Sequence, residues 1–181
     1  MAVLKPPKRS RLLGEHPLIF VTVGSNQPFD RLIQAVDAWA KAHPSVDVFA
    51  QIGSGDFQPS HLRYTRSMSP ADFRAGLEAA EIIVAHVGMG TIISALELGK
   101  SLVLMPRRVA YHEHTSDHQL DDLEWLFQRE GVFVAMTERD FEGAMTKAMA
   151  SLTSGSGGFL NEHAAQLASR IRQYMVMGDG S

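Results

Sequence analysis

Short runs of apolar residues alternate with longer amphipathic stretches along most of this chain. The run at residues 18–23 is apolar almost throughout, as in a strand that is buried on both faces. The pattern predicts strands at residues 18–23, 46–50, 62–65, 82–85, 102–105 and 132–134. It predicts helices at residues 28–42, 70–80, 116–129, 138–150 and 161–175, with a further helix after Gly90. This alternation predicts an α/β fold, in which a parallel sheet of about six strands carries helices on both faces.

Local composition divides the chain into four segments. Residues 17–152 carry the alternating pattern and are expected to form one α/β domain. Residues 153–158 are rich in glycine and serine and predict a flexible linker, and residues 159–181 predict a C-terminal helix and tail. Residues 1–16 are basic, and two interpretations stay open for them. They form either a flexible, solvated N-terminal segment or a weak contact with an anionic membrane surface.

Composition excludes several classes of protein. The chain has 181 residues, of which 45% are hydrophobic and 20% charged, as in a soluble globular protein. No apolar stretch approaches the roughly 18 residues that span a bilayer, and no signal-peptide core follows the basic start, so export is not expected. The absence of cysteine excludes disulfides and thiolate catalysis. The net charge of -3 argues against nucleic-acid binding.

The turn after the fourth predicted strand carries the clearest candidate chemistry. That strand leads into His86, and Gly88 and Gly90 precede the helix. Glycines let backbone N–H groups approach a ligand closely, and the aligned peptide dipoles at a helix N-terminus favour negative charge. Thr91 adds a hydroxyl in the first turn of the helix. The segment therefore predicts an anion site, and phosphate is the expected ligand.

Structural interpretations compete with these functional ones. His86 either contacts phosphate or is a hydrogen-bonded histidine with a structural role. Thr91 either donates to phosphate or satisfies its own helix start. Met89 is expected to line a cleft, and Trp39 and Trp125 are expected to lie in the core or in a subunit contact.

Two more polar turns fall at the same edge of the predicted sheet. Gly24 and Ser25 follow the first strand, and residues 106–119 follow the fifth. Open parallel sheets bind ligands beyond the carboxyl ends of their strands, so all three turns are expected to lie near one site. Arg107 and Arg108 either face a diphosphate or a negatively charged sugar, or lie on the surface.

A metal site is the alternative for the third turn. It contains His112, Glu113, His114, Asp117 and His118, whose side chains suit zinc or iron. However, His112 and His114 are not spaced as helical partners that would fix a coordination geometry. Contact with sugar or phosphate, or plain solvation, is preferred, and no metal is expected.

A resemblance to a known family rests on three segments: VTVGS at 21–25, AEIIVAHVGMGTIISALELGKSLVLMPR at 80–107 and DHQ at 117–119. In order and spacing they resemble the C-terminal, donor-binding domain of family 28 glycosyltransferases. The likeness is to stand-alone versions of that domain. These include the catalytic subunit of the dolichol-pathway N-acetylglucosaminyl transferase and bacterial exopolysaccharide subunits.

The resemblance implies roles for the matched residues. The residues implied to bind diphosphate are Gly24, Ser25, His86, Gly88, Met89, Gly90 and Thr91. Those implied to bind the nucleoside are Arg66, Ser67, Met68 and Ser94, and those implied to bind the sugar are Asp117, His118 and Gln119. The family usually has a glutamate where this chain has Ser94. A serine hydroxyl can hydrogen-bond one ribose hydroxyl but not both.

The resemblance also implies a fold and an activity. The fold is the Rossmann-like C-terminal half of a GT-B enzyme. The activity is an inverting hexosyl transfer from a UDP-sugar to a lipid-linked acceptor, in surface polysaccharide or glycolipid synthesis, with no metal or other cofactor. Two-domain relatives bring the acceptor and the general base from their N-terminal domain. A membrane-anchored partner subunit is therefore expected, with this chain cytoplasmic and peripheral to the inner face of the membrane; a homodimer is left open.

Other functions remain compatible with the same pattern. They are a nucleotide-sugar epimerase or hydrolase, a non-catalytic nucleotide-sugar-binding regulatory subunit, and a dinucleotide-binding module. The last is disfavoured because residues 24–27 read Gly-Ser-Asn-Gln, which is not the G-x-G-x-x-G pattern of dinucleotide sites.

Overall fold

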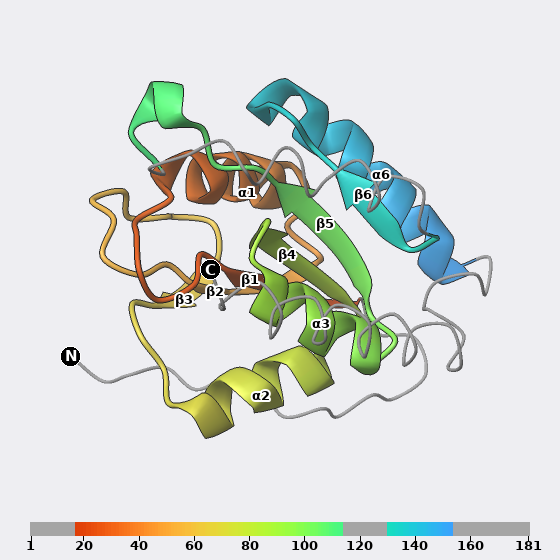
Figure 1. Ribbon diagram of the computed structural model, residues 1–181. Helices are drawn as coiled ribbons and strands as arrows, with labels where there is room; N and C mark the ends of the chain where they lie inside the picture. Colours follow the sequence, from red (N-terminus) through yellow and green to blue (C-terminus); the bar gives the residue numbers. More distant parts are fainter. Residues whose placement is uncertain (1–16, 114–129, 154–181) are drawn as a thin grey trace, which may run out of the picture.

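The structure is a computed structural model that describes residues 17–113 and 130–153 (Figure 1). Several predicted features lie outside these ranges. They are the basic N-terminal segment, the predicted helices at 116–129 and 161–175, Trp125 and the candidate sugar residues Asp117, His118 and Gln119. In the described ranges no helix is long and apolar enough to cross a membrane.

Six parallel strands form one sheet in the order β3-β2-β1-β4-β5-β6. The strands are β1 (Leu18–Thr22), β2 (Asp47–Gln51), β3 (Arg63–Thr65), β4 (Ile82–His86), β5 (Ser101–Met105) and β6 (Val132–Val134). All six predicted strands are therefore present, and the α/β fold with a six-stranded parallel sheet is confirmed. The strand order reverses between β1 and β4, which places a crevice beyond their carboxyl ends.

Helices cover both faces of the sheet, as Figure 1 shows. They are α1 (Asp30–Ala42), α2 (Pro70–Ala79), α3 (Met89–Glu97) and α6 (Glu138–Thr153), with a short 3₁₀ helix, η1 (Val109–Tyr111), after β5. Side chains alternate across a strand. In β1, Ile19 and Val21 pack with α1 and α6, whereas Phe20 packs with α2 and α3. Each face of the sheet therefore has its own hydrophobic core.

Local sequence signals explain where the helices begin and end. Ser69 caps α2 as predicted, because its Oγ accepts a hydrogen bond from the Asp72 backbone N–H at 3.1 Å. α1 begins at Asp30 and not at Pro28, since the backbone of Phe29 is not helical. α6 continues past Ala150 to Thr153. In its last turn the hydroxyls of Ser151 and Thr153 donate to helix carbonyls at 2.7 and 2.8 Å.

Trp39 lies in the core between α1 and the sheet, where it is only 5% exposed. Of the two predicted places, the core and a subunit contact, the core is therefore confirmed for Trp39. The ring of His43 stacks on it with the ring centres 4.2 Å apart.

Candidate functional site

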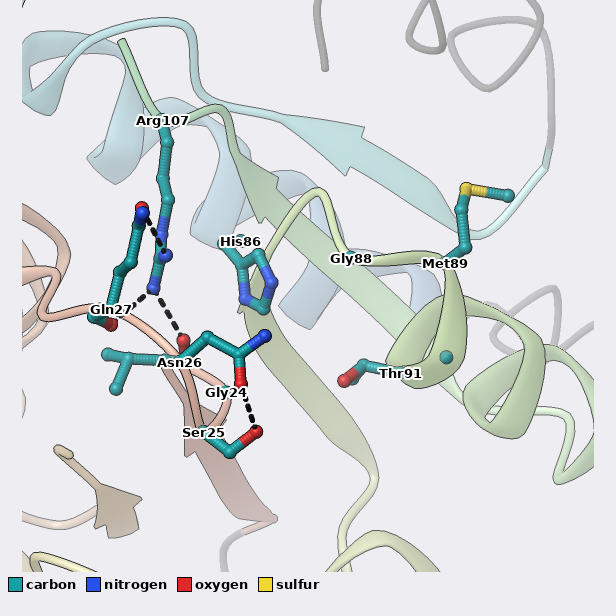
Figure 2. A pocket seen from close by; sticks show the side chains of 11 residues that line it. Gly24, Ser25, Asn26, Gln27, His86, Gly88, Met89, Thr91 and Arg107 are labelled. Atoms are coloured by element: carbon teal, nitrogen blue, oxygen red, sulfur yellow. Dashed lines mark hydrogen bonds between the residues drawn. The ribbon is translucent and has the colours of Figure 1, made fainter. Parts of the chain in front are cut away.

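Two turns from neighbouring strands enclose a cavity beyond the carboxyl ends of β1 and β4 (Figure 2). The cavity has a volume of about 280 Å³. It is lined by Val23, Gly24, Ser25, Asn26, Gln27, His86, Gly88, Met89, Gly90, Thr91 and Arg107. The structure thus brings together all seven residues that the resemblance implies for diphosphate. We call this space the turn cavity.

The ring of His86 fits closely against two glycines. A methyl group added at Gly24 would lie 2.8 Å from His86 Cε1, and one added at Gly88 would clash with His86 Nε2. Gly24 also has a φ of +77°, in the left-handed region that other residues rarely adopt. Both glycines are therefore required by this packing, which holds the imidazole at the wall of the turn cavity.

The N-terminus of α3 forms another wall of the turn cavity. The Ile92 N–H donates to the carbonyl of Gly88, the N-cap residue, at 3.1 Å. The N–H groups of Met89, Gly90 and Thr91 precede that bond, and N–H groups in this position have no partner within their own helix. Thr91 is only 8% exposed, and its side chain lines the cavity, whereas Figure 2 shows the Met89 side chain directed away from His86. This wall suits an anion.

A buried network of side chains holds the Gly24 turn from the β2 side. Thr22 Oγ1 donates to Gln51 Oε1 at 2.7 Å and accepts from the Gly24 N–H at 3.1 Å. Gln51 Nε2 donates to the Gly24 carbonyl at 3.0 Å and to the Arg66 carbonyl at 3.3 Å. Sequence reasoning missed Thr22 and Gln51. The signal that could have found them is a polar residue directly after the apolar run of each strand.

Arg107 holds the same turn from the β5 side. Its Nη2 donates to the carbonyls of Val23 and Gln27, each at 2.7 Å, as the dashed lines in Figure 2 show. The residue is 3% exposed, so it is not a surface arginine. Its guanidinium lies over the Phe29 ring, with Cζ 5.3 Å from the ring centre. Burial lowers the pKa of the guanidinium, and the negative charge of Glu113 opposes part of that shift.

A second cavity of about 790 Å³ adjoins the turn cavity. Arg66, Ser67 and Met68 line it, so three residues implied to bind the nucleoside lie together. The two cavities share Gly24, Ser25, Gly90 and Thr91. Ser94 lines neither of them, and its hydroxyl donates to the carbonyl of Gly90 at 2.9 Å. A ligand in the larger cavity would reach the α3 N-terminus directly.

The segment after β5 is fixed to α1 by an ion pair. Glu113 accepts hydrogen bonds from Arg31 Nε and Nη2, both at 2.8 Å, and from the Arg108 backbone N–H at 2.9 Å. Burial alone would lower the pKa of Arg31, but the hydrogen bonds and the charge of Glu113 outweigh it and raise the pKa above its ordinary value. Glu113 therefore has a structural role here. Within residues 17–113 and 130–153, no group of three acidic or histidine side chains is placed to hold a metal ion.

Replacing Gly24 with alanine is expected to destabilise the protein by about 1–2 kcal/mol, because alanine is disfavoured at positive φ. Urea unfolding measures the effect. Gly143→Ala is the control, because Gly143 lies inside α6 with nothing within 4 Å of an added methyl group. That change should raise the stability by roughly 0.8–1 kcal/mol. Equal changes in stability for Gly24→Ala and Gly143→Ala would contradict the expected backbone strain of alanine at position 24.

Comparison with known proteins gives a family and a fold. Residues 18–138 match the profile of the glycosyltransferase family 28 C-terminal domain. The UDP-N-acetylglucosamine transferase subunit ALG13 of Yarrowia lipolytica is 24% identical over 134 residues, which are 65% of this chain and 64% of that protein. The chain thus spans less than two thirds of this relative's length.

Solved structures share the same fold at low sequence identity. The solution structure of ALG13 has a TM-score of 0.55 at 16% identity, with 87% of this chain and 95% of that chain covered. The glycosyltransferase VinC, solved in complex with DTDP, has a TM-score of 0.56 at 18% identity, with 93% of this chain and 40% of VinC covered. The described sheet and helices are those of one half of a GT-B glycosyltransferase.

Proposed function

Because the chain belongs to the family of glycosyltransferase family 28 C-terminal domains, we propose that it is the donor-binding subunit of an inverting, UDP-sugar-dependent glycosyltransferase. The observation that carries the proposal is the meeting of the Gly24 turn, His86 and the α3 N-terminus around one cavity. The relative from Yarrowia lipolytica is named as a UDP-N-acetylglucosamine transferase subunit, and this name supports UDP as the nucleotide.

The diphosphate would lie where the two cavities join, between Gly24 and Thr91. There the N–H groups of the first turn of α3 and the Thr91 hydroxyl donate to the phosphate oxygens. The half-buried His86 adds a further hydrogen-bonding group, and the buried cation of Arg107 adds positive charge. VinC, which has the same fold, was solved with a nucleoside diphosphate, which supports this class of ligand.

The nucleoside would occupy the larger cavity, beside Arg66, Ser67 and Met68. The Phe73 ring and the Met68 side chain supply apolar surface there. Ser94 lines neither cavity, so the single hydrogen bond proposed between it and the ribose requires the hydroxyl to leave the Gly90 carbonyl and the ribose to extend beyond the larger cavity. Asp117, His118 and Gln119 lie outside the described residues and remain the proposed contacts to the sugar.

The reaction would be a direct displacement at the anomeric carbon. The acceptor oxygen forms a bond to that carbon while the bond to the diphosphate oxygen breaks, so the configuration inverts. A general base takes the proton from the acceptor hydroxyl, and the donors around the turn cavity stabilise the negative charge of the departing diphosphate. These hydrogen bonds and the Arg107 cation do the work that a metal would otherwise do.

The acceptor is proposed to be a lipid-linked sugar or phosphate carried by a membrane-anchored partner subunit, which would also supply the general base. This chain would then sit peripherally at the cytoplasmic face of the membrane. Across the described residues, the large hydrophobic side chains that are exposed are Val109 and Tyr111, at 38% and 61%. Both lie on η1, and the Arg31 guanidinium stacks against the Tyr111 ring at 5.1 Å. We propose η1 as part of the surface that meets the partner.

The purified chain is expected to bind UDP or a UDP-sugar more tightly than NAD. The turn cavity suits a diphosphate at the end of one helix, and the first turn lacks the dinucleotide pattern. Thermal-shift titration across nucleotides measures the preference. Adding EDTA should leave UDP binding unchanged. Stabilisation by NAD and none by UDP would contradict the proposed donor, and a large loss of binding with EDTA would point to a metal.

A further inference from the structure

We propose that Arg107 is a positioning residue, whose planar guanidinium holds the Gly24–Gln27 turn in the shape that accepts a diphosphate. The proposal rests on the proposed function, because it names the side chain that shapes the same cavity. The nitrogen Nη2 donates at 2.7 Å to the carbonyl of Val23, which precedes the turn, and at 2.7 Å to the carbonyl of Gln27, which ends it. One nitrogen thus bridges both ends of the turn.

The sheet brings Arg107 to this place. In the register of β4 and β5, His86 is paired with Met105, so the chain leaving β5 passes beside the His86 wall of the turn cavity. Pro106 and Arg107 are both buried, and Figure 2 shows the Arg107 side chain extending from this segment to the turn after β1. The turn after β1 is therefore tied across β4 to the end of β5.

Gln51 binds the Gly24–Gln27 turn from the β2 side. Its Nε2 donates to the Gly24 carbonyl at 3.0 Å. Three carbonyl oxygens of the segment, those of Val23, Gly24 and Gln27, are thus bonded to side-chain donors. A carbonyl oxygen carries partial negative charge and would repel a phosphate. Holding these oxygens on Arg107 and Gln51 keeps them from turning toward the anion.

The chemistry of the guanidinium matters as well as its charge. Its donors lie in a rigid plane, so two carbonyls can be bound in a fixed relative position, whereas a lysine ammonium on a flexible stem cannot impose that geometry. Arg107 is only 3% exposed as a residue. Water screens a buried charge only weakly, so the positive charge of Arg107 acts across the turn cavity.

The test compares UDP with uridine, which lacks phosphate. Arg107→Lys and Arg107→Met should each weaken UDP binding about tenfold or more, while uridine binding changes less than about threefold. Gln51→Met should also weaken UDP binding, but Gln51 lines the larger cavity as well and therefore takes no part in the comparison with uridine. Arg74→Gln is the control for a lost positive charge. Arg74 is 76% exposed on α2, and this variant should bind both ligands as the wild type does. Calorimetry measures UDP, and NMR titration measures the weaker uridine.

Each other outcome has a defined meaning. Wild-type affinity for UDP in Arg107→Lys would overturn the role of the planar group, and an equal loss for UDP and uridine would show general distortion. If the Arg107→Met variant does not fold, Arg107→Lys still decides the question.

A measurement without ligand separates this proposal from the proposed function. The backbone amide NMR signals of residues 24–27 should shift in unliganded Arg107→Lys, more than those of α6. Unshifted signals would overturn the positioning role. If the wild type binds no UDP while these signals do shift, the proposed function fails and the positioning role stands.

Discussion

Replacing Thr91 with valine, or His86 with alanine, is expected to weaken UDP binding about 10- to 150-fold. Each change removes a hydrogen-bonding group from the wall of the turn cavity, and a hydrogen bond to a charged group contributes roughly 1.5–3 kcal/mol. Valine has nearly the shape of threonine, so the helix start should keep its packing in the core, where Thr91 is 8% exposed. Isothermal calorimetry with UDP measures the loss.

Thr146→Val is the matched control for the first substitution. Thr146 lies on the exposed face of α6, where its hydroxyl donates to the Glu142 carbonyl at 2.9 Å. This variant should keep wild-type affinity, and all three variants should keep the far-UV circular dichroism of the wild type. If both site variants bind UDP as tightly as the control, the phosphate site lies elsewhere.

The isolated chain is expected to bind a UDP-sugar but to transfer sugar only when a membrane-anchored partner is present. GT-B catalysis occurs between two halves, and the described sheet and helices have the fold of one of them. The proposed donor site also opens beyond the carboxyl ends of β1 and β4. Transfer of radiolabelled sugar to lipid, measured with and without a co-expressed neighbouring protein, tests the requirement.

A substitution on η1 separates donor binding from partner docking. Tyr111→Ala should leave UDP affinity unchanged, since Tyr111 lines neither cavity, but should reduce partner-dependent transfer and co-purification. Robust transfer to a lipid acceptor by the pure chain would show that no partner is required. UDP-sugar binding without transfer, in the presence of every candidate partner, would favour a non-catalytic regulatory subunit.

The fold follows closely from local sequence signals. The strand at residues 132–134 lies where the apolar run predicts it, and the Ser69 cap starts α2 as expected. The meeting of Gly24 with His86 also follows from general rules, because turns at the carboxyl ends of parallel strands share one edge of the sheet. These features depend on short sequence segments or on a rule that parallel sheets share, which is that the carboxyl ends of their strands lie at one edge.

Long-range side-chain pairings did not follow from the sequence. Arg107 binds carbonyls on a turn far away in the chain, and Arg31 on α1 binds Glu113 across a similar separation. Nothing in the neighbouring residues of Glu113 distinguishes a salt-bridge partner from a metal ligand. Such pairings depend on strand order and register, which the apolar pattern leaves undetermined.

The placement of β4 between β1 and β5 also bears on how the protein folds. β1 must pair with a strand that follows it only after α1, β2, β3 and α2, so closing the centre of the sheet carries a large loop-closure cost. The turn cavity cannot exist until that pairing is made. A ligand that occupies the cavity therefore has little to bind in early folding species, and it prolongs the lifetime of the folded chain without hastening its formation.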